Sequence, residues 1–62
     1  MNRAEFHQRH AERATADAQR LLAQRPALGS RWLDWVAVEL YRLSPPEYAA
    51  MVRRELARLN ED

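Results

Sequence analysis

Side chains that support chemistry are few in this sequence, and its two histidines are the first to consider. His7 and His10 lie three residues apart, so both imidazoles can lie on the same side of a helix. A structural zinc site needs four ligands and a catalytic site needs three and a water, but only Glu5 and Gln8 lie nearby. We therefore predict no metal and no cofactor. His7 is expected to be a packed polar residue at a helix contact, where its protonation would weaken association as the pH falls.

Nucleophilic catalysis is not indicated either. Ser30 and Ser44 each precede a segment with helical periodicity and are best explained as helix caps, whereas Thr15 falls in the middle of such a segment. Cysteine is absent, and all ten basic residues are arginine, which removes every mechanism that depends on a lysine. The sequence therefore predicts a protein that is not an enzyme.

Arginines in the first helical segment are one candidate for nucleic-acid binding. At about 100° per residue they fall within a narrow stripe that could follow a phosphate backbone, and they are Arg9, Arg13 and Arg20. Acidic residues, among them Glu12 and Asp17, flank this stripe, and the formal net charge of the chain is only +1. A nearly neutral chain has no long-range field that attracts DNA, so a solvated face is the simpler interpretation.

A second candidate for nucleic-acid binding follows the proline-rich turn. Arg53, Arg54 and Arg58 lie in the helix after this turn, where a helix-turn-helix protein has its recognition helix. Recognition helices present their N-terminal residues to base edges, but here those residues include Pro46 and Glu47, which are poor donors. A small dimeric DNA-binding regulator is therefore kept as the alternative hypothesis.

The segment 31–43 (RWLDWVAVELYRL) is apolar on more than one side of the helix that it is predicted to form. Trp35 and Val38 lie beside Arg31 and Arg42, and we call these four residues the Trp35 face. Tryptophan and arginine are the residue types most enriched at binding hot spots. Three interpretations remain open for this face: an ordinary core position, self-association, or docking on a different protein.

Helical periodicity and helix breakers divide the chain into three helices within a single domain of 62 residues. The helices are predicted over residues 3–24, 31–43 and 45–59. Asn2, Ser30 and Ser44 are predicted to cap them. The expected fold class is all-α, a small three-helix domain in which the long first helix packs on a tight corner between the second and third helices.

The first helix carries a seam of mostly small residues that would let another helix approach closely. The seam consists of Ala4, His7, Ala11, Ala14, Ala18 and Leu21. The core opposite it is predicted to consist of Leu33, Val36, Leu40, Tyr48, Val52 and Leu56. A chain of this length buries only about 60% of its unfolded surface. Because it lacks disulfides as well, packing or oligomerisation must supply its stability.

The start of the chain lacks the apolar run of a signal peptide, and the sequence has no stretch of about 20 apolar residues. We therefore expect a cytoplasmic protein without a membrane partner. Together these features predict a non-enzymatic protein-interaction module that homodimerises or docks on a larger protein through the Trp35 face. Accessory and inhibitor proteins of phages and mobile elements are often small and helical, which makes them one class to consider.

Overall fold

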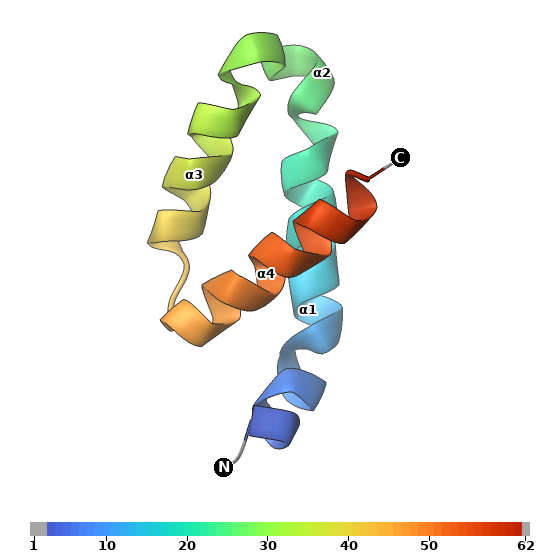
Figure 1. The fold of residues 1–62 in the computed structure, drawn as a ribbon, viewed down its shortest axis with the longest axis vertical. Coiled ribbons are helices and arrows are strands. Elements are labelled where there is room, and N and C mark those ends of the chain that lie inside the picture. The colour runs from blue at the N-terminus through green and yellow to red at the C-terminus, as the bar shows by residue number, and fades with distance from the viewer. Residues whose placement is uncertain (1–2, 62) are drawn as a thin grey trace.

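The structure is a computed structural model that describes residues 3–61, and every element in this part of the chain is helical. The elements are α1 (Arg3–Ala23), α2 (Arg25–Leu28), a 3-10 turn η1 (Gly29–Arg31), α3 (Trp32–Arg42) and α4 (Pro46–Leu59), as Figure 1 shows. The predicted all-α fold class is therefore confirmed.

The connection between α1 and α3 holds more helix than the sequence predicted. Pro26 lies at the start of the single turn of α2, where its missing N–H costs nothing. Gly29 then adopts a positive φ of 56°, a conformation that favours glycine, and the chain reverses its direction there. This reversal brings α3 back along α1.

Neither serine caps a helix, so both predicted caps are wrong. The N-cap residue of α3 is Arg31, because η1 runs directly into α3 without a break at Ser30. The N-cap residue of α4 is Pro45, whose extended backbone places Pro46 in the first turn of the helix. No side chain caps either helix. The predicted Asn2 cap lies outside the described residues.

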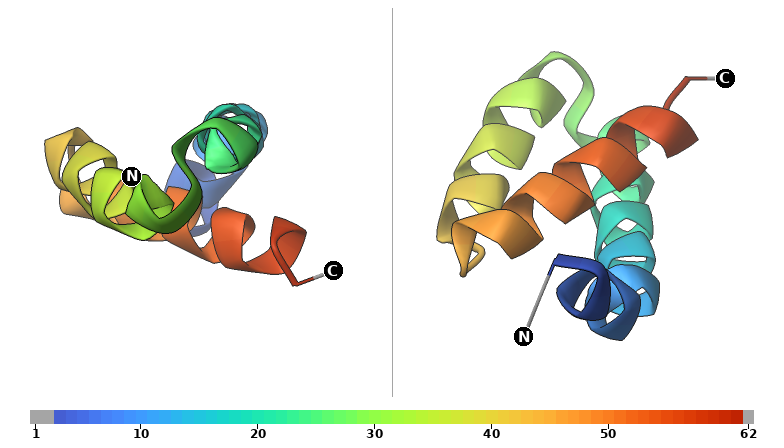
Figure 2. Two further views of the ribbon diagram at one scale, coloured as in Figure 1. Left: turned by 90° about the horizontal axis from the view of Figure 1, so that it is seen from above. Right: turned by 60° about the horizontal axis from the view of Figure 1, so that its bottom comes forward.

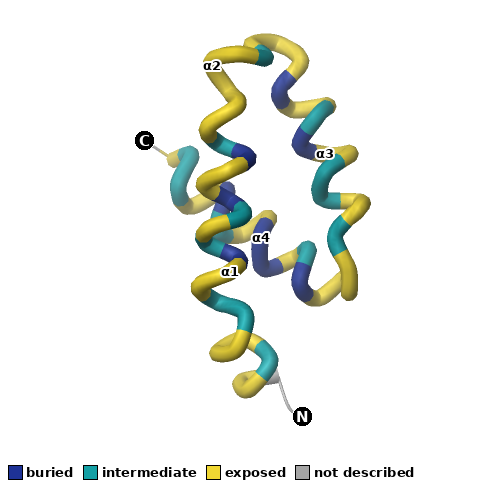
Figure 3. Tube along the Cα trace, turned by 180° about the vertical axis from the view of Figure 1, so that it is seen from behind, coloured by how far each residue is buried: buried dark blue, intermediate teal, exposed yellow. Residues whose placement is uncertain are grey.

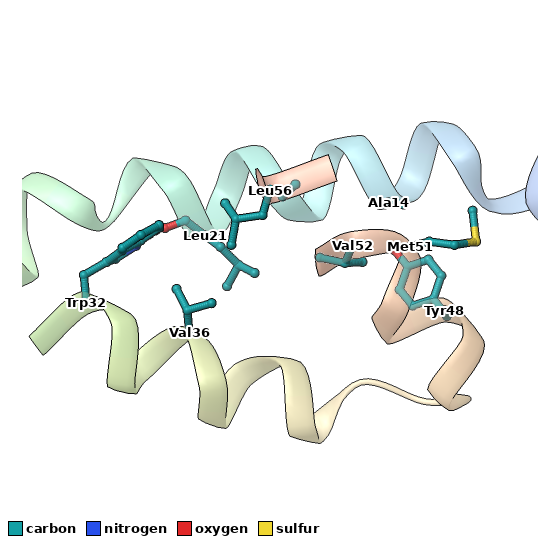
Figure 4. Packing of buried hydrophobic residues seen from close by; sticks show 9 residues of the cluster. Ala14, Leu21, Trp32, Val36, Tyr48, Met51, Val52 and Leu56 are labelled. Carbon is teal, nitrogen blue, oxygen red and sulfur yellow. The ribbon is translucent and has the colours of Figure 1, made fainter. Parts of the chain in front are cut away.

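The main packing contact joins α1 to α4, which crosses it (Figure 1). Ala14 and Ala18 of α1 are completely buried there, and so is Val52 of α4. Figure 4 shows Ala14 and Val52 in this cluster, where small side chains on α1 allow α4 to pack closely. The alanine seam is thus correct from Ala14 to Leu21. In its first half Ala4 and His7 are exposed and Ala11 is half-buried, so the prediction is wrong at Ala4 and His7.

The contact of α3 with the rest of the chain differs from the prediction by a rotation about the helix axis. Trp32 and Val36 are buried, whereas Leu33, which was predicted as core, is 70% exposed. The Trp32 indole explains the rotation, since its Nε1 donates a hydrogen bond of 2.8 Å to the Leu21 carbonyl oxygen (Figure 4). Turning this large side chain inward turns Leu33 outward. Leu40 is only half-buried.

The molecule is thin, with extents of 39 × 23 × 14 Å. Its radius of gyration is 11.9 Å, compared with about 10.6 Å for a compact chain of the same length. Helix α3 lies at one side and is joined to α1 and α4 by few contacts (Figure 2). The side of α3 that points away from the other helices is therefore uncovered, as the exposed segments in Figure 3 show.

Candidate protein-interaction surface

The four residues of the Trp35 face have different environments. Trp35 is half-buried and packs against the core, whereas Arg31 and Val38 are exposed. Arg42 is also exposed and forms an ion pair with Glu39, in which Nη1 lies 3.5 Å from Oε2. The structure therefore divides this face between the core and the solvent, and its role as an interface stays a prediction.

The large exposed hydrophobic residues of the described chain all lie on α3. They are Leu33, Val38 and Tyr41, with exposures of 70%, 51% and 91%. Leu33, Ala37 and Tyr41 are four residues apart and form one ridge along the helix, which we call the α3 outer face. The i, i+4, i+8 spacing of this ridge is visible in the sequence, but periodicity alone placed Leu33 in the core and gave no role to Tyr41.

A groove of about 650 Å³ lies beside this ridge, between α3 and α4. It is lined by Ala37, Leu40, Tyr41, Leu43, Pro46, Ala49, Ala50 and Arg53. Most of these side chains are small or apolar, and Arg53 supplies the charge. A mostly apolar lining of this kind can receive apolar groups of a small molecule or of another polypeptide.

The arginines proposed for nucleic-acid binding do not form one shared patch of free cations. Arg20 lies 3.8 Å from both Asp17 and Glu39, and Arg13 lies over the Tyr48 ring, 4.9 Å from its centroid. These contacts engage part of the predicted stripe on α1, although Arg9, Arg13 and Arg20 all remain exposed.

On α4 the three candidate arginines also separate. Arg58 donates to Glu55 at 2.9 and 3.1 Å, Arg53 lines the groove, and Arg54 is exposed and points back to the Ala50 carbonyl. Their positions around the helix differ, as the sequence predicted from the angle per residue. Binding of nucleic acid by these residues stays a prediction that the geometry does not strengthen.

Polar groups at the α1–α4 contact form hydrogen bonds that hold the fold together. The Tyr48 hydroxyl donates to the Asp17 carboxylate, and burial together with this bond raises the pKa of Tyr48 to about 12. The Thr15 hydroxyl donates to Glu55 Oε1 at 2.7 Å. Donation from Arg58 and Thr15 lowers the pKa of Glu55 to about 2. Neither group titrates near neutral pH, where a general acid or base would act.

The histidines lie in two different settings. His10 is half-buried beside Tyr48, with 5.6 Å between the ring centroids, and Phe6 also contacts it, with 4.5 Å between the ring centroids. His7, by contrast, is exposed at the edge of a cavity of about 230 Å³. The prediction that His7 packs at a helix contact is therefore wrong within this chain. Among residues 3–61 no three potential ligands gather closely enough for a metal ion.

Comparisons of the chain with protein-family models, with curated proteins and with solved structures found no match. In the described part of the chain, no helix is long and apolar enough to span a membrane. The most distinctive surface of the described residues is the exposed side of α3 with the groove beside it.

Proposed function

We propose that this chain is a small three-helix protein-interaction module without enzymatic activity, and that it binds another protein surface through α3. The observation that supports this proposal is the concentration of exposed large hydrophobic residues on one helix. Scattered exposed leucines are ordinary on a monomer, but a contiguous apolar ridge beside an apolar groove is typical of a binding surface. The proposed contact surface combines the α3 outer face with Val38 and the groove wall on α4.

The composition of this surface agrees with what protein interfaces use. Tyr41 is an aromatic side chain with a polar tip, a type enriched at interface cores, and Arg53 offers a guanidinium at the edge. The Trp35 face borders the same surface through Val38. Arg31 and Arg42 are therefore proposed as polar residues at its rim rather than as its centre.

Site-specific photo-crosslinking in living cells tests this proposal. A photoreactive phenylalanine analogue at Tyr41 should give adducts with protein, because this side chain is 91% exposed on the proposed surface. The same analogue at Ala16, which is exposed on α1, is the matched control and should give none. Absence of adducts from position 41, or equal labelling at both positions, would show that α3 is not the binding surface.

A further inference from the structure

The geometry of α3 points to a specific occupant, and this inference rests on the proposed function. We infer that the α3 outer face binds a second copy of the same chain, with the two α3 helices antiparallel and a two-fold axis passing beside Ala37. The ridge of Leu33, Ala37 and Tyr41 would then be complementary to itself. The partner is thus identified by the symmetry of the residue pattern.

The spacing of the ridge residues is symmetric about Ala37. At 1.5 Å per residue, Leu33 and Tyr41 lie about 6 Å on either side of Ala37 along the helix axis. A two-fold axis beside Ala37 reverses the second helix, so Leu33 of one copy lies opposite Tyr41 of the other. Each aromatic ring then meets an aliphatic side chain, and this happens twice in the interface.

The residue at the centre of the ridge, Ala37, is small. Helices that pack closely have axes about 8–10 Å apart, and ridges formed by every fourth residue interdigitate in the commonest packing class. Ala37 is exposed and would face its own copy across the axis, where a larger side chain would hold the helices apart. The groove of about 650 Å³ next to Ala37 leaves room for Leu33 or Tyr41 of the second copy.

Polar groups on α3 are also complementary in this arrangement. Within residues 3–61, neither Asp34 nor the Tyr41 hydroxyl has a polar partner, and both are exposed. In the antiparallel arrangement Asp34 lies only about 1.5 Å along the axis from the partner copy's Tyr41, on the same side of the interface. The hydroxyl can therefore donate to the carboxylate. The two Asp34 carboxylates are about 9 Å apart along the axis, and at that distance salt largely screens their repulsion.

The available surface sets the expected strength of the dimer. Stable interfaces bury roughly 800 Å² on each partner. Helix α3 is only about 16 Å long, so one side of it cannot supply that area alone. The wall of the groove on α4, including Pro46 and Ala50, must therefore contribute to the contact. A formal charge of +1 on each copy causes little mutual repulsion. We expect a weak dimer whose population rises with protein concentration.

Sedimentation equilibrium of the purified full chain over a range of concentrations, combined with charge variants at Ala37, tests the inference. The wild type should reach a dimer mass below about 1 mM. Ala37→Glu and Ala37→Lys each place like charges against each other at the axis, so each should weaken dimerisation by about a hundredfold. An equal mixture of the two variants should restore the dimer as a one-to-one heterodimer, which native mass spectrometry resolves.

The controls separate failure of this inference from failure of folding and of the proposed function. Ala16→Glu, the same substitution on the exposed side of α1, should leave the dimer unchanged, and circular dichroism should show equal helix content in all variants. A wild type that stays monomeric, or a dimer that ignores both charges at position 37, overturns the inference. If the wild type is monomeric while position 41 still crosslinks to a different protein, self-association fails and the proposed function stands.

Discussion

The α1–α4 contact and the attachment of α3 both rely on apolar side chains, but the two regions differ in how completely they bury them. At the α1–α4 contact, Ala14, Ala18 and Val52 have no exposed surface. Helix α3 buries only Trp32 and Val36, and leaves three large hydrophobic residues in solvent. Small residues that face a crossing helix thus allow a short chain to bury its apolar side chains completely. A helix that is apolar nearly all round, by contrast, cannot be covered by two neighbouring helices.

The largest effect is expected at the junction that anchors α3. Trp32→Ala removes a buried indole and its hydrogen bond to the Leu21 carbonyl, and should lower the free energy of unfolding by about 3–5 kcal/mol. A domain of this size has about that much stability in total, so the variant should be largely unfolded at 25 °C. Chemical denaturation followed by circular dichroism measures this loss. Trp35→Ala is the matched variant, and its half-buried side chain should cost clearly less.

A valine-to-alanine substitution can be made both in the α1–α4 contact and on α3, so the two regions can be compared with the same chemical change. Val52→Ala opens a cavity in the fully buried α1–α4 contact and should lower the free energy of unfolding by about 2 kcal/mol. Val38→Ala removes the same two methyl groups from a side chain that is 51% exposed on α3, and should change stability by less than about 0.5 kcal/mol. Urea denaturation at a protein concentration too low for dimer formation measures both changes in the free energy of unfolding. Similar losses from the two variants would contradict the contrast between the regions.

An effect smaller than that of Val52→Ala concerns a hydrogen bond and depends on pH. Tyr48→Phe removes the hydroxyl that donates to Asp17, which should cost about 1 kcal/mol at neutral pH. The pKa of Tyr48 is raised from 10.0 in the unfolded chain to about 12 in the folded state. The stability that the Tyr48 hydroxyl contributes is therefore fully present below pH 10 and is lost as the pH rises towards 12.

Tyr48→Phe should lack the part of the alkaline loss of stability that comes from this hydroxyl. The urea midpoints of the wild type and of Tyr48→Phe between pH 10 and 12 measure the difference. Tyr41→Phe controls for general alkaline effects, because the Tyr41 side chain is 91% exposed. Parallel alkaline slopes for the wild type and Tyr48→Phe would show that the Tyr48 hydroxyl does not stabilise the α1–α4 contact.

Periodicity predicted the α1–α4 contact well because each helix there has one clearly apolar side. Val52 and Leu56 are buried as expected, and so are Ala14 and Ala18. The seam failed at Ala4 and His7 because a heptad pattern carries no information about which of its positions a crossing helix covers. His7 is therefore exposed even though its position in the pattern equals that of the buried alanines.

The orientation of α3 could not be predicted from its own sequence. A helix with apolar residues at most positions offers several faces of similar hydrophobicity, so tertiary contacts decide which of them turns inward. Here the bond from Trp32 to Leu21 decides, and it joins residues 11 positions apart. Because of this rotation, the surface proposed from the structure is the ridge that includes Leu33 and Tyr41, whereas the sequence predicted a surface centred on Trp35.

The buried indole of Trp32 also gives the molecule a built-in optical reporter. Indole emission depends on the polarity around the ring, and Trp32 is 4% exposed with its Nε1 bonded to a main-chain oxygen. Replacing Trp35 by phenylalanine would leave Trp32 as the single tryptophan in the chain. Its fluorescence would then follow the detachment of α3 from the end of α1 separately from the loss of helix content.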